Sequence, residues 1–152
     1  MSIDVECRDD HLKTLGVGVR RGGYICGYSF AIEDGPAAYV PIAHAGGDNV
    51  ENPKAALQYL RDQAKVFTGD ICGAGLQYDL DYLAEQKIVF RSAKRFRDCQ
   101  IAEPLLDELQ FKYSLEAIAQ RRGLPGKDET MLREAAKCYG VDPKQDMWKL
   151  PA

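Results

Sequence analysis

Hydrophobic and polar residues alternate at the start of the chain, where Ile3 and Val5 are separated by acids. This period of two predicts a strand with one buried face. Residues 24–34, YICGYSFAIED, repeat the period with aromatic and aliphatic side chains and predict a second strand. Residues 37–44, AAYVPIAH, predict a third strand, and Pro41, which cannot donate a ladder hydrogen bond, favours an edge position for it.

The apolar spacing changes to three and four after Asn52-Pro53, a typical helix start, and predicts a helix over residues 53–67. The short apolar run 71–74 predicts a buried strand, residues 76–83 predict the next helix, and KIVF at 87–90 predicts another strand. Three more helices are expected, starting near Asp98, Ser114 and Asp128 and ending near Leu109, Arg122 and Tyr139.

This order of elements favours an α/β fold, with a mixed five-stranded sheet flanked by helices. Strands joined by short turns predict an antiparallel meander, and a strand reached through a helix predicts a right-handed parallel crossover. We expect the first strand in the centre, with the second and third strands antiparallel to it. Residues 1–152 have the size of one domain and show no boundary, so we expect a single domain.

Composition narrows the classes of function only a little. The net charge of -3 argues against strong non-specific nucleic-acid binding but still allows a local patch. Five cysteines without a Cys-x-x-Cys spacing argue against a disulfide framework or zinc site and favour reduced thiols. The chain contains neither the ~20-residue apolar run of a membrane span nor a signal-peptide pattern, so we expect a cytoplasmic protein without membrane association.

The first strand carries the first candidate chemistry. Asp4 and Glu6 are two positions apart and therefore project from the same face of a strand. Two adjacent buried carboxylates repel each other, and a divalent cation such as Mg²⁺ or Mn²⁺, which prefers carboxylate oxygens, removes that repulsion. The alternative is an edge strand on which both acids are solvated.

A second candidate lies in GAGLQYDLDYLA, residues 73–84, where an apolar run ends and a helix begins at once. If the crossover places this run beside the first strand, Asp79 faces Asp4 and Glu6. Three carboxylates could then share two metal ions about 3.5–4 Å apart, an arrangement that supports phosphodiester hydrolysis. The alternative is that Asp79 and Asp81 form a solvated helix face near a favourable dipole.

These motifs resemble the 3′→5′ proofreading exonuclease domain of polymerase-I-type (family A) DNA polymerases, especially phage versions. Asp4-Val5-Glu6 resembles the family's first motif, and GAGLQYDLDYL, ending at residue 83, resembles the second. Three further segments resemble the family in the same order: YVPIAH (39–44), RDCQIAEPLL (97–106) and YSLEAIAQRRG (113–123).

The family belongs to the DEDD exonucleases, which have a ribonuclease-H-like fold. The resemblance implies metal-dependent 3′→5′ exonuclease activity on the 3′ end of single-stranded DNA. It implies Asp4, Glu6 and Asp79 as catalytic metal ligands, with Mg²⁺ or Mn²⁺ as the cofactor. It also implies a polymerase domain encoded downstream as a partner.

Two positions depart from the family pattern. Gly75 stands where the family usually has Asn. The family's fourth acid belongs to a Tyr-x-x-x-Asp motif, whereas Tyr139 and Asp142 are one residue too close. We therefore expect a domain truncated at the C-terminus, lacking the final helix with the third motif and impaired as an isolated chain. The alternative is a catalytically inactive module of the same fold that binds nucleic acid or protein.

Overall fold

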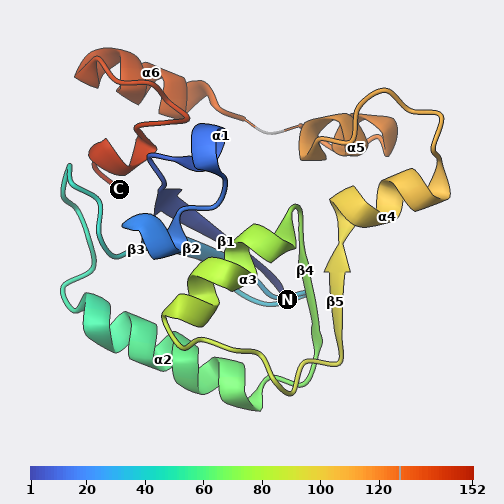
Figure 1. The fold of residues 1–152 in the computed structure, drawn as a ribbon, viewed down its shortest axis with the longest axis horizontal. Helices are drawn as coiled ribbons and strands as arrows, with labels where there is room; N and C mark the ends of the chain where they lie inside the picture. Colours follow the sequence, from blue (N-terminus) through green and yellow to red (C-terminus); the bar gives the residue numbers. More distant parts are fainter. Residues whose placement is uncertain (127) are drawn as a thin grey trace.

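The fold is described from a computed structural model, which covers residues 1–126 and 128–152 (Figure 1). Its strands and helices follow one another along the chain as β1 (Ser2–Arg8), α1 (Leu12–Leu15), the 3₁₀ turn η1 (Val19–Arg21), β2 (Tyr24–Ala31), β3 (Ala37–Pro41), α2 (Pro53–Val66), β4 (Asp70–Gly73), α3 (Leu76–Glu85), β5 (Arg95–Asp98), α4 (Cys99–Leu106), α5 (Leu115–Arg121), α6 (Thr130–Tyr139) and the 3₁₀ turn η2 (Met147–Lys149).

The five strands form one mixed sheet in the order β3-β2-β1-β4-β5. β1 is central as predicted, antiparallel to β2 and parallel to β4. β3 is an edge strand, in agreement with Pro41 at its end. The expectation that β3 is antiparallel to β1 is wrong. β3 is antiparallel to β2, and because a meander reverses direction at each turn, β3 runs in the same direction as β1.

The predicted strand at residues 87–90 is also wrong, since the fifth strand is β5, eight residues later. Ile88 and Phe90 instead insert into the core from a connection, and both are almost fully buried. A run of four apolar residues is equally compatible with a buried strand and with a connection whose side chains pack into the core. β5 has no apolar signature because it lies at the sheet edge, where Arg95 and Arg97 form ion pairs with Asp70 of β4.

The two faces of the sheet differ in character. In Figure 1 the helix α3 crosses in front of the strands and α2 runs below them, and the buried side chains of both helices join Ile3, Val5 and Tyr28 in the hydrophobic core. The opposite face presents small and polar side chains. They form cross-strand rows, which are Ser2, Ala31 and Ala37; Asp4, Ser29 and Tyr39; and Glu6, Gly27 and Pro41. Both predicted acids of β1 therefore lie on the face away from the core.

Several predicted helix boundaries are confirmed by their caps. The side chains of Asn52, Asp98 and Ser114 accept backbone N–H bonds at the starts of α2, α4 and α5. Gly140 ends α6 in the left-handed region, with φ of 65°. None of the helices in residues 1–126 and 128–152 combines the length and the apolar character that crossing a bilayer requires.

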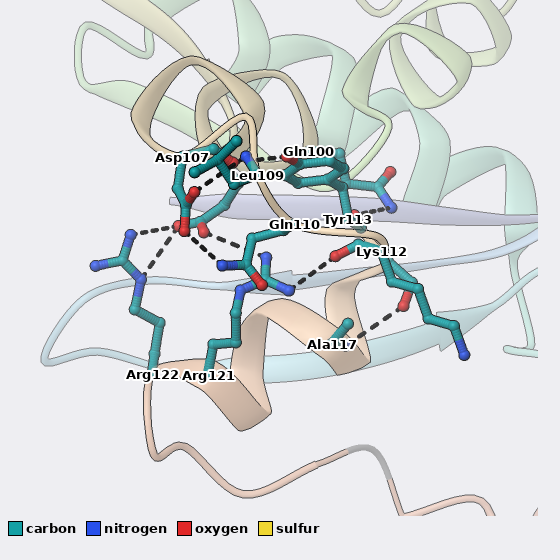
Figure 2. A network of polar contacts seen from close by, with 11 residues as sticks. Gln100, Asp107, Leu109, Gln110, Lys112, Tyr113, Ala117, Arg121 and Arg122 are labelled. Carbon is teal, nitrogen blue, oxygen red and sulfur yellow. Dashed lines mark hydrogen bonds and ion pairs between the residues drawn. The ribbon is translucent and has the colours of Figure 1, made fainter.

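Figure 2 shows how α4 and α5 are held together by polar contacts. Nε of Arg122 donates to the buried Glu103 carboxylate at 3.1 Å, and the Tyr113 hydroxyl donates to the Asp107 carbonyl at 2.6 Å. At the start of α4, the side-chain amide of Gln100 donates to the Tyr113 carbonyl at 3.3 Å. This network fixes the hairpin of α4 and α5 and links it to the end of β5.

Candidate functional site

β1 presents the two predicted acids in the middle of the sheet. Ile3 and Val5 are buried toward the helices, whereas Asp4 is exposed and Glu6 half-buried on the other face. The edge-strand alternative is wrong because β1 is paired on both sides, with β2 and β4. The shared face predicted from the period of two is therefore present.

A bulge lies at the end of this acidic pair. The pairing of β1 with β2 shifts register between Glu6 and Cys7. A bulge bends a strand and re-aims the side chains beside it. The Cys26 thiol donates to the Glu6 carbonyl at 3.0 Å and ties this irregular backbone to β2. Nothing in the local sequence marks the bulge, since both flanking residues are compatible with a regular strand.

Asp79 is brought to β1 by the parallel crossover. β4 pairs with β1 at the start of β1, where Ser2 lies opposite Cys72. Beyond this point, the first turn of α3 approaches the edge of β1, and Oδ1 of Asp79 accepts a hydrogen bond from the Val5 backbone N–H at 2.9 Å. The Asp79 side chain thus replaces a missing strand contact.

The two acids of α3 have different environments. Asp79 is only 3% exposed, so the solvated-face alternative is wrong for it. That alternative fits Asp81, which forms an ion pair with Arg20 at 2.9 Å on the outside of the helix. Asp79 and Asp81 therefore do not form one solvated helix face, because the crossover buries Asp79 and leaves Asp81 at the surface.

Burial raises the pKa of Asp79 from 3.8 to about 7. The hydrogen bond from Val5 opposes this change, and the negative charges of Asp4 and Asp98 add to it. The Asp79 and Asp4 carboxylates are therefore close enough to interact electrostatically. A cation placed between them would favour the ionised form of both.

The donor chemistry of this cluster fits a hard divalent cation, since Asp4, Glu6 and Asp79 offer carboxylate oxygens. Within residues 1–126 and 128–152, however, no three His, Cys, Asp or Glu side chains are arranged closely enough to hold a metal ion. The structure thus brings Asp79 to the strand that carries both other acids without closing a three-ligand set. The ligand assignment stays a prediction.

Asp98 supports the site in a way that sequence reasoning missed. Its carboxylate caps α4 by accepting from the Gln100 N–H at 2.8 Å. It also accepts from the N–H groups of Gly75 and Leu76 at 3.2 and 2.7 Å, at the start of α3. The sequence indicated a helix start at Asp98, but the second role depends on β4 and β5 being neighbours.

Gly75 departs from the family pattern without changing the backbone. It precedes α3 with φ of 75°, in the left-handed region. Glycine adopts this conformation freely, and Asn tolerates it better than most residues. Both glycine and asparagine therefore fit this turn. The glycine of this chain differs only in having no polar side chain.

Tyr39 and His44 form a second polar element beside the acids. The Leu150 carbonyl can only accept, so Nδ1 of His44, 3.1 Å away, is the donor. Burial lowers the pKa of His44 and favours its neutral form, which leaves Nε2 to accept from the Tyr39 hydroxyl. Tyr39 is not among the site residues predicted from the sequence.

Asp142, the acid closest in spacing to the family's third motif, stabilises a turn. Oδ1 of Asp142 accepts from the backbone N–H groups of Lys144 and Gln145 at 2.8 and 2.7 Å. Tyr139, three positions earlier, is exposed at the end of α6. Asp142 is therefore engaged with its own turn, and the absence of a fourth acid stays a prediction.

No protein-family profile matches the chain. Over 154 aligned residues it is 56% identical to a DNA-directed DNA polymerase of Pseudomonas phage M6. The alignment covers 100% of the chain and 23% of the polymerase, so the chain spans about a quarter of this relative.

Two solved structures share the fold. One is described as the apo form of a nuclease, with a TM-score of 0.58 and 16% identity over 99% of this chain and 58% of the other. The second is Brucella melitensis NrnC bound to pGG, with a TM-score of 0.53 and 19% identity over 84% of this chain and 54% of the other. At these identities the likeness concerns the fold alone.

Proposed function

The chain is a ribonuclease-H-like domain related to a segment of a phage DNA polymerase, and from this premise we propose that it is a 3′→5′ exonuclease domain acting on single-stranded DNA ends. Asp4, Glu6 and Asp79 hold Mg²⁺ or Mn²⁺ in this proposal. The observation that carries it is the buried Asp79 carboxyl, bonded to Val5 and within electrostatic range of Asp4 at the central strand.

The chain's own residues divide the work of such a site. The Val5 N–H fixes Oδ1 of Asp79, and Asp98 fixes the turn from which α3 starts. Asp4 is exposed on the sheet face away from the hydrophobic core, here called the open face, and is accessible to a phosphate from solvent. A bound divalent metal would polarise the scissile phosphate and lower the pKa of an attacking water. The role of the carboxylates is then to bind the metal ion and keep its positive charge beside the phosphate.

The isolated 152-residue chain is expected to be slow. Its Asp142 is engaged in a turn, and residues 1–152 contain no Tyr-x-x-x-Asp spacing. Loss of one electrostatic contact to a transition state typically costs on the order of 10²–10³ in rate. Binding of the strand end should suffer less than the chemistry, because binding does not need the complete set of charges.

The test is digestion of a 5′-labelled single strand by excess protein with Mg²⁺ or Mn²⁺. The proposal predicts slow shortening from the 3′ end that stops with EDTA and in Asp4→Asn, Glu6→Gln and Asp79→Asn. Asp81→Asn is the matched control, since Asp81 lies on the same helix but pairs with Arg20 at the surface. Shortening that persists in all three site variants, or that proceeds from the 5′ end, would overturn the proposal.

A non-catalytic binding module of the same fold is the second candidate. The observation that favours it is the lack of a closed three-ligand set in the described residues. It predicts that the wild-type chain binds a strand or a protein, while strand length stays unchanged at any protein excess.

A further inference from the structure

Tyr39 shares a cross-strand row with one of the candidate ligands. It pairs with Ser29 of β2, which in turn pairs with Asp4 of β1. Directly paired residues project to the same face, so Tyr39 and Asp4 lie on the open face with only Ser29 between them. Strand spacing of roughly 5 Å places the two backbone positions about 10 Å apart.

The Tyr39 ring leans across the sheet toward Glu6. A Cβ atom on Gly27 would overlap Oη and Cζ of Tyr39, so the phenol end of the ring lies directly over this glycine. Gly27 pairs with Glu6. The ring therefore lies along the sheet surface instead of standing upright, and its polar end is about one strand spacing, roughly 5 Å, from the strand of Glu6.

The ring is also held in this orientation. Its hydroxyl is hydrogen-bonded to Nε2 of His44. The His44 and Tyr39 rings meet edge-on, with their centroids 5.9 Å apart. Nδ1 of His44 is in turn bonded to the Leu150 carbonyl. Despite these contacts Tyr39 remains 40% exposed. Its row neighbour Ser29 is small and takes little space beside the ring.

We propose that Tyr39 is a stacking platform for a nucleobase at the 3′ end of the bound strand. The inference rests on the proposed function, because it requires the terminal phosphodiester to lie at Asp4, Glu6 and Asp79. A base near that phosphate reaches the ring beside Gly27. Aromatic rings stack on every base, so the platform orients strand ends without selecting their sequence. The prior ordering of the ring by His44 reduces the entropy lost on binding.

The test measures binding of a 5′-fluorescein single strand by anisotropy, with Ca²⁺ replacing Mg²⁺ to suppress cleavage. Strands end in either an intact or an abasic 3′-terminal nucleotide. For the wild type, removing the base should weaken binding roughly 5- to 150-fold. Tyr39→Leu should weaken binding of the intact strand by a similar factor and should bind both strands equally. Tyr39→Phe, which keeps the ring, should retain the preference for the intact strand.

Tyr59→Leu is the matched control, because Tyr59 is 65% exposed on α2 and lies on the covered side of the sheet. It should behave as the wild type. 2-Aminopurine at the 3′ terminus should be quenched on binding the wild type and not on binding Tyr39→Leu.

Two outcomes overturn the proposal. If the losses from Tyr39→Leu and from base removal multiply, the ring and the base act independently, and the platform fails while the proposed function stands. If the wild-type chain does not bind a strand end with any divalent ion, both fail.

Discussion

Replacing Asp79 with Asn should stabilise the metal-free protein at alkaline pH. The Asn side-chain carbonyl can still accept from the Val5 N–H, as Oδ1 of Asp79 does at 2.9 Å, and the substitution removes only the charge. Raising the pKa of this carboxyl from 3.8 to about 7 corresponds to an upper bound of about 4 kcal/mol for ionising the buried group in the folded state.

The sign of the pH dependence follows from the raised pKa. Between about pH 4 and pH 7 the folded state keeps a proton on Asp79 that the unfolded state has lost. The stability contribution is therefore greatest below pH 4, falls as pH rises through this window and is constant above it. From pH 5 to pH 8 the wild type should lose about 2–3 kcal/mol relative to Asp79→Asn.

Urea unfolding of both proteins at pH 5 and pH 8, in EDTA, measures this difference directly. Comparing the wild type with the variant at each pH cancels the titration of groups that both share. Asp81→Asn serves as the control, since it removes a carboxylate from the same helix at a surface ion pair with Arg20. A constant difference between the wild type and Asp79→Asn at both pH values, or a variant that is less stable at pH 8, would refute the burial argument.

Two further substitutions test the support of the site. Asp98→Ala removes the acceptor of the N–H groups of Gly75, Leu76 and Gln100, so the free energy of unfolding in urea should fall by about 2–4 kcal/mol. Ser114→Ala removes a single helix cap and should lower it by about 1 kcal/mol. Gly75→Asn should cost less than about 1 kcal/mol at φ of 75°, whereas Gly75→Val should cost at least 1–2 kcal/mol more, and equal losses would contradict the left-handed turn.

The parts of the fold that the sequence predicted are those in which local pattern and tertiary structure agree. The alternation around Ile3 and Val5 placed Asp4 and Glu6 on one face correctly, because one face of the central strand is buried. The strand-to-helix step near Gly75 predicted the crossover correctly, because a parallel neighbour needs such a connection.

The remaining features depend on contacts between segments that are distant in the sequence. The strand β5 was missed because its charged residues pair with Asp70 at an edge, while the apolar run ending at Phe90 fills the core without pairing. The double role of Asp98 and the position of Tyr39 over Gly27 arise only when neighbouring strands are in register. The hydrophobic and polar pattern of a single segment does not predict these contacts.

The proposed exonuclease function requires that Asp4, Glu6 and Asp79 share a divalent metal. Anomalous diffraction from a crystal soaked in Mn²⁺ measures this without relying on turnover. We expect an anomalous peak within coordination distance, about 2.0–2.2 Å, of oxygens from these carboxylates. The peak should be lost in Asp79→Asn and retained in Asp81→Asn. A peak only elsewhere, or no peak at a Mn²⁺ concentration that binds the protein in solution, would contradict this expectation.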